Sequence, residues 1–192
     1  MRLILGLLLS IAIAATVGLG ATFFSLTHGV AFGSYTIGPW TAWPKTGTVE
    51  IDPYARATIA RSGALPLGLA DGVEFLAATD NAGAALDGRC EVLLSGVTPL
   101  ARFWTLTLYD PEGRLIANIL NRHGFTSQEV IRNADGSFDI LISPRARSGN
   151  WLPTGGAERF MLVLRLYDTP VGVATRATRE TLMPQIRTRT CT

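Results

Sequence analysis

Histidine and aspartate are the residue types with which this chain could do acid–base chemistry. His123 lies in Asn121-Arg122-His123-Gly124, and an imidazole pKa near neutrality suits a general acid or base. The alternative interpretation is a polar loop residue beside glycine. Asp110 and Asp168 resemble a carboxylate pair, but each follows a strand-like run, where aspartate favours turns.

Arg165 is a candidate for anion binding. It lies in the predicted strand 159–167, on the face that also carries Tyr167. An arginine among apolar neighbours needs a partner, and Asp139 is one candidate; capture of an anion or carboxylate is the alternative. Tyr109 ends an earlier strand in the same Leu-x-Leu-Tyr-Asp pattern. This repeated pattern is explained either by duplication of one strand or by convergence of two Tyr-Asp turns.

The run Asn150-Trp151-Leu152-Pro153 combines an amide, a large aromatic ring and a rigid proline. As a loop it could stack a sugar or close a pocket. It could equally plug one end of the domain, with the indole N–H satisfied inside. Asn150 and Trp151 therefore join Arg165, Tyr167, Tyr109 and His123 as candidate binding residues.

Several classes of function lack their signatures. The P-loop, G-x-G-x-x-G, G-x-S-x-G and H-E-x-x-H patterns do not occur, so we assign no catalytic residue and expect no cofactor. Two cysteines and two scattered histidines lack metal-ligand spacing, so no metal site is expected. The net charge of +2 is too small to indicate nucleic-acid binding. Arg176, Arg179, Arg187 and Arg189 near the C-terminus face one acid, Glu180; this tail is either simply solvated or contacts an anionic lipid or polymer.

The segment 3–27 has no charged side chain and is long enough to cross a bilayer. Arg2 and the amino terminus place the positive end inside, so we expect a single-pass inner-membrane protein with its C-terminal domain in the periplasm. A cleaved signal peptide is the alternative. If the segment stays as an anchor, we expect Trp40, Trp43 or both to lie near the headgroups. In an exported chain, Cys90 and Cys191 are expected to form a disulfide.

Beyond a linker at 28–49, the pattern predicts one β-rich domain at 50–192. Asp52-Pro53 signals the start of a short helix that ends at Ser62. Short β-favouring runs separated by Gly, Pro, Asn and Asp then predict an antiparallel β-sandwich of jelly-roll type. The expected strands are 73–77, 89–95, 102–110, 115–120, 129–132, 138–143 and 159–167.

These runs, in their order along the chain, resemble the domain of unknown function 1214 family. The shared features are the Phe103-Trp104 strand ending in Tyr109-Asp110, the Asp135-Gly136-Ser137 hairpin, the 150–153 run and the strand ending at Tyr167. The resemblance covers about residues 96–170 and implies a jelly-roll β-sandwich without an established reaction. Longer relatives carry a preceding 1254-family domain, which this chain lacks.

Two functions follow as hypotheses. The first is a non-catalytic binding or accessory module of the cell envelope, which would bind a glycan, a lipid or a protein through one sheet face or the 150–153 loop. The second is an envelope enzyme acting on a glycan, lipid or small molecule, in which His123, Arg165 and an aspartate converge. The enzyme hypothesis requires those three side chains to lie within hydrogen-bonding distance in one pocket, whereas the binding-module hypothesis does not.

Overall fold

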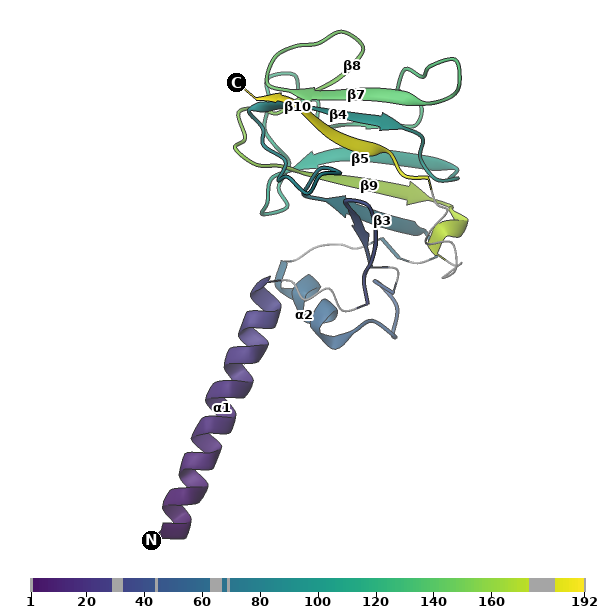
Figure 1. The fold of residues 1–192 in the computed structure, drawn as a ribbon. Helices are drawn as coiled ribbons and strands as arrows, with labels where there is room; N and C mark the ends of the chain where they lie inside the picture. Colours follow the sequence, from purple (N-terminus) through teal and green to yellow (C-terminus); the bar gives the residue numbers. More distant parts are fainter. Residues whose placement is uncertain are drawn as a thin grey trace.

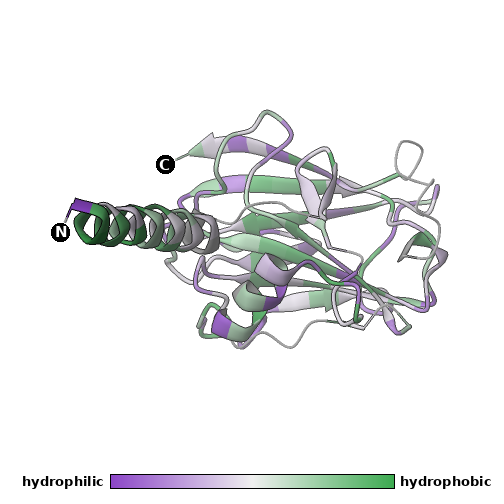
Figure 2. Ribbon diagram, turned by 90° about the horizontal axis from the view of Figure 1, so that it is seen from below, coloured by the Kyte–Doolittle hydropathy of each residue, from purple (hydrophilic) through white to green (hydrophobic). Residues whose placement is uncertain are grey.

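The computed structural model describes residues 2–28, 33–43, 45–62, 67–68, 70–172 and 182–191. The N-terminal helix α1 (Arg2–His28) is apolar along its length (Figure 2). Its span Arg2–Ser25 is long and apolar enough to cross a membrane, and none of that span is buried inside the protein. By length and composition, such a helix suits a membrane anchor or a signal sequence.

A second helix, α2 (Pro53–Ser62), begins as the sequence predicts. The carboxylate of Asp52 accepts hydrogen bonds from the N–H groups of Tyr54 (2.9 Å) and Ala55 (3.2 Å). These bonds satisfy N–H groups that have no partner within the helix, and proline at the first position needs no such bond.

Within the described residues, the strands form two sheets (Figure 1). The six-stranded sheet is antiparallel throughout and has the order β1-β2-β3-β9-β5-β6. Its strands are β1 (Tyr35–Ile37), β2 (Trp40–Ala42), β3 (Gly72–Ala77), β9 (Met161–Tyr167), β5 (Phe103–Tyr109) and β6 (Gly124–Thr126).

The four-stranded sheet has the order β10-β4-β7-β8. Its strands are β10 (Gln185–Cys191), β4 (Cys90–Gly96), β7 (Phe138–Ser143) and β8 (Asn150–Pro153). The β7–β8 pairing is parallel, which departs from the antiparallel prediction. A single 3-10 turn, Pro170–Gly172, follows β9 in the described part of the chain.

One hydrophobic core joins the two sheets. Alternate residues of each strand face inward, so Leu106 of β5 and Ile140 of β7 are both fully buried. The rings of Trp104 and Phe138, one from each sheet, lie 5.1 Å apart between centroids. The strands therefore fold into one packed domain rather than two.

The C-terminal strand β10 is held at several points. Asn81 donates its N–H to the carbonyl of Ile186 (2.9 Å), and its side chain accepts the N–H of Ile186 (2.6 Å). The indole of Trp40 donates to the carbonyl of Pro184 (2.8 Å), and the Cys90–Cys191 disulfide closes the far end. Trp40 is fully buried, so the expectation that it lies at the headgroups is wrong.

The turn that presents Asn81 depends on a buried carboxylate. Asp80 is 6% exposed and accepts the N–H groups of Ala82 and Ala84, both at 2.9 Å. Burial alone would raise the pKa of Asp80, but Thr188 and these two hydrogen bonds together outweigh it, and the pKa lies below its usual value. Gly83, with φ of 84°, adopts the left-handed conformation that closes the predicted turn.

Some predicted elements differ from the observed ones. The run 115–120 is an irregular loop, because the side-chain oxygen of Asn118 accepts the N–H groups of Leu120 and Arg122. The run 129–132 forms an isolated bridge rather than a strand. Residues 35–37 and 40–42, assigned to the linker from sequence, form β1 and β2. Arg176, Arg179 and Glu180 lie outside the described residues.

Candidate functional site

Arg165 lies in the middle of the six-stranded sheet, on its outer face. Its neighbours across the register are Glu74 of β3 and Thr105 of β5. The guanidinium Nε donates to the Glu74 carboxylate (2.7 Å), and Nη1 donates to the hydroxyl of Tyr109 (3.2 Å). It also lies 5.6 Å from the centroid of the Tyr109 ring. Arg165 and Tyr109, two candidates from the sequence, are therefore in contact.

The partner of Arg165 is Glu74 and not Asp139. Asp139 lies in β7, where it pairs with Ser95 in the other sheet, so the predicted pairing is wrong. Alternation along β3 places Glu74 opposite the buried faces of Val73 and Phe75. The sequence contained this signal for an outward-facing acid, but only the strand order shows that β3 lies beside β9.

Glu74 and Tyr109 stabilise the protonated, positively charged form of Arg165. Partial burial alone would lower the pKa of Arg165, but the negative charge of Glu74 and the hydrogen bond with Tyr109 outweigh that effect and raise it. Arg165 and Glu74 have side-chain exposures of 24% and 34%. The pair is thus a fixed, charge-balanced feature that still reaches the surface.

The register arranges the outer face around this pair in rows. One row contains Leu76, Val163 and Thr107, and the row at the Tyr109 end contains Met161. The row at the other end contains Phe103 and Tyr167, whose ring centroids are 5.8 Å apart. Aromatic rings thus flank the ion pair at both ends.

Tyr109 and Tyr167 lie at opposite ends of the β5–β9 pair. Tyr109 is opposite Met161, whereas Tyr167 is opposite Phe103. The two Tyr-Asp exits therefore do not form one site, and Asp110 and Asp168 are separated in the same way. Asp110 instead accepts the N–H groups of Glu112 and Arg114, which makes it a turn residue.

Asn150 and Trp151 belong to strand β8, not to the predicted loop. Asn150 is 7% exposed; its oxygen accepts the N–H of Ile131 (2.8 Å), and its Nδ2 donates to the carbonyls of Ile131 (2.8 Å) and Asp139 (2.9 Å). The indole of Trp151 donates to the carbonyl of Ser143 (3.1 Å). The polar atoms of both side chains are therefore used within the fold.

His123 precedes the edge strand β6 and lies on the opposite face of the sheet from Arg165. The pairing of Gly124 with Thr107 places His123 opposite Leu108, whose side chain is buried in the core, whereas Arg165 faces outward. The ring Nδ1 of His123 lies 3.0 Å from the carbonyl of Ile116. Among the described residues, no hydrogen bond joins His123 to Arg165, whose side-chain partners are Glu74 and Tyr109.

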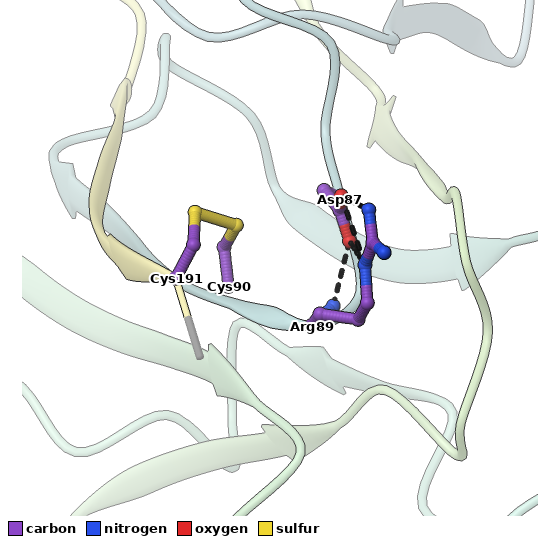
Figure 3. A network of polar contacts seen from close by, with 4 residues as sticks. All are labelled: Asp87, Arg89, Cys90 and Cys191. Carbon is purple, nitrogen blue, oxygen red and sulfur yellow. Dashed lines mark hydrogen bonds and ion pairs between the residues drawn. A yellow bond between two sulfur atoms is a disulfide. The ribbon is translucent and has the colours of Figure 1, made fainter.

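The predicted disulfide is confirmed. Cys90, at the start of β4, is bonded to Cys191, at the end of β10 (Figure 3). Beside it, Arg89 binds Asp87 through three side-chain hydrogen bonds, which lower the pKa of Asp87 to about 2. In the described part of the chain, no three His, Cys, Asp or Glu side chains are grouped so that they could hold a metal ion.

Solved structures of other proteins are similar to this chain. The crystal structure of the VPA0106 protein from Vibrio parahaemolyticus is similar over 71% of this chain, with a TM-score of 0.57 and 24% identity. A putative uncharacterized protein from Burkholderia cenocepacia matches 93% of the chain, with a TM-score of 0.46 and 16% identity. This chain covers 35% and 43% of those proteins, so it spans well under half of their length. No curated protein matches it.

A family described as "Protein of unknown function (DUF1214)" matches residues 71–171, which run from just before β3 through β9 to the turn that follows it. This stretch is more than half of the chain and includes the Glu74–Arg165–Tyr109 cluster. The chain belongs to the DUF1214 family.

Proposed function

We propose that this protein is a non-catalytic binding module of the cell envelope, tethered by α1 and exposing its domain on the periplasmic side of the inner membrane. An exposed apolar helix and a domain closed by a disulfide support this placement, because disulfides persist in oxidising compartments. We further propose that the two sheets form a sandwich of jelly-roll type.

The binding surface in this proposal is the outer face of the six-stranded sheet. The observation that carries it is the Arg165–Glu74 pair, partly exposed and flanked by Tyr109 at one end and by Phe103 and Tyr167 at the other. Aromatic rings provide apolar faces on which a ligand can stack, and the ion pair provides both donors and acceptors.

A glycan suits this surface best. Sugars present apolar C–H faces and hydroxyl groups, which match the rings and the threonine hydroxyls of Thr105 and Thr107. The pair of Arg165 and Glu74 contributes no net charge, so the surface selects neither a polyanion nor a polycation. Partly buried apolar side chains such as Leu76 widen the contact.

A glycan array with the full chain in detergent tests this proposal, followed by calorimetry with the best-binding oligosaccharide. Tyr167→Ala removes an aromatic ring from the face and is expected to weaken binding about tenfold, which corresponds to about 1.4 kcal/mol. The matched variant, Trp151→Phe, alters an aromatic side chain of the other sheet and is expected to leave affinity unchanged. Loss of binding in Trp151→Phe but not in Tyr167→Ala would place the site at β8 and contradict the proposal.

A further inference from the structure

The outer face of the four-stranded sheet carries a separate group of arginines. A shallow, open hollow lies where β4, β7 and β10 meet the β7–β8 connection. Its lining includes Arg145, Arg147, Thr190 and Glu91. Arg187 and Arg189 continue this group along β10, so we call Arg145, Arg147, Arg189 and Arg187 the arginine track.

Glu91 fixes two members of the arginine track. Its carboxylate accepts a hydrogen bond from Nε of Arg147 (2.6 Å) and lies 3.7 Å from Nη1 of Arg189. The bond from Arg147 is the main reason that the pKa of Glu91 lies below its usual value, so the carboxylate stays ionised. Glu91 is 14% exposed, whereas Arg147 and Arg189 are 41% and 49% exposed. The acid is thus covered and the arginines remain accessible.

The positive charge of the arginine track exceeds its negative charge. Glu91 is one carboxylate among four arginines, and Asp139, another acid on this face, lies at the far end beside Ser95. Arg145 is exposed, and its guanidinium has no hydrogen-bond or ion-pair partner among the described residues. Arg89, which also lines the hollow, is neutralised locally by Asp87 (Figure 3).

We propose that this hollow binds a phosphate group through Arg145, Arg147 and the hydroxyl of Thr190. Guanidinium groups donate paired N–H bonds that match oxyanions. The donors come from different elements, β10 and the β7–β8 connection, and therefore converge from several directions. A tetrahedral phosphate offers acceptors in several directions, whereas a planar carboxylate offers two oxygens in one plane.

In this proposal the phosphate is one unit of a polyphosphate chain and not a lipid headgroup of the membrane that α1 would cross. Figure 1 shows β10 and the C-terminus at the end of the domain opposite α1. Arg187 and Arg189 extend the positive surface beyond the hollow, so further phosphates of an elongated ligand would meet them. This site lies on the other sheet from the proposed glycan surface and does not depend on that function.

Calorimetry with the full chain in neutral detergent tests the site, with inorganic phosphate and polyphosphate as probes. Arg145→Gln removes a guanidinium that makes no hydrogen bond or ion pair with the described residues, and it is expected to weaken the binding of both probes about tenfold without altering stability. The control is Arg61→Gln, which makes the same charge change in α2, outside the hollow; it is expected to have no effect on either probe.

The two probes also distinguish the sources of phosphate. Tighter binding of polyphosphate, weakened by Arg187→Gln and by added salt, supports a chain. If inorganic phosphate binds saturably with the same affinity per site as polyphosphate, and only Arg145→Gln weakens it, the result supports a phosphate site in the hollow. The same result contradicts binding of a polyphosphate chain along the arginine track. Equal affinities for wild type, Arg145→Gln and Arg61→Gln, or no saturable binding of either probe, overturn the proposal.

Discussion

Removal of the Cys90–Cys191 disulfide is expected to destabilise the domain strongly. The bond joins residues 101 positions apart, and the chain-entropy relation for a loop of about that length gives ~4.7 kcal/mol. Measured losses for native disulfides in small secreted domains are about 2–5 kcal/mol. A domain of typical stability, about 5–15 kcal/mol, would lose a large fraction of its free energy of unfolding.

The expected loss acts mainly through the unfolded state. In the folded state β10 keeps its pairing with β4, the two bonds between Asn81 and Ile186, and the bond from Trp40 to Pro184. The folded domain of a Cys90→Ala/Cys191→Ala variant is therefore expected to be nearly unchanged. The unfolded chain gains freedom and exposes more surface, so the denaturant dependence should become steeper.

Urea unfolding of the full chain in detergent, followed by tryptophan fluorescence, measures both quantities. The variant should unfold at lower urea with a loss of about 2–5 kcal/mol, and reduction of the wild type should reproduce that loss. Reductant added to the variant is the control and should change nothing. A loss below about 1 kcal/mol, with an unchanged slope, would show that the bond does not restrain the unfolded chain.

Three further substitutions test the internal contacts by the same urea titration. Asp80→Asn should cost about 1–3 kcal/mol. The pKa of Asp80 is depressed in the folded state, so its carboxylate stabilises the protein above about pH 4 and this contribution is lost as the pH falls further. The free energy of unfolding of the variant should therefore depend less on pH below about pH 4 than that of the wild type. Equal acid sensitivity of the two proteins would contradict this. Trp40→Phe leaves the carbonyl of Pro184 without its donor and should cost about 1–3 kcal/mol; a neutral effect would contradict the buried bond. Asn150→Ala removes three hydrogen bonds and should cost at least as much as Trp40→Phe, whereas a smaller cost would show that water replaces them.

The strands that the sequence predicted best are those with one buried face. In β5, Trp104, Leu106 and Leu108 alternate with outward residues, and in β9, Leu162, Leu164 and Leu166 do the same, so period-two patterning located both. The helix at Pro53 was predictable for a local reason as well, since capping by Asp52 involves only adjacent residues.

The elements that sequence reasoning missed depend on distant partners. Strand β8 has the composition of a turn, and it becomes a strand because Asn150 bonds to Ile131 and Asp139 and because β7 lies beside it. Strand β10 alternates arginine and threonine, a pattern that resembles a solvated tail. Its order comes from β4, Asn81 and the disulfide.

The candidate site was predictable only in part for the same reason. Arg165 and Tyr109 were both identified as candidate binding residues, yet 56 positions separate them along the chain. Their contact, and the pairing of Arg165 with Glu74, follow from the order β3-β9-β5, which no local pattern encodes. The same order shows that Tyr167 and Tyr109 lie at opposite ends of the face.

Protease and thiol accessibility in intact spheroplasts tests the proposed placement most directly. If α1 anchors the domain outside the cytosol, external protease should digest residues 45–192 without lysis, and maleimide should label the cysteines only after reduction. Protection of the domain until the cells are lysed, with both thiols free, would contradict the envelope location and every function proposed from it.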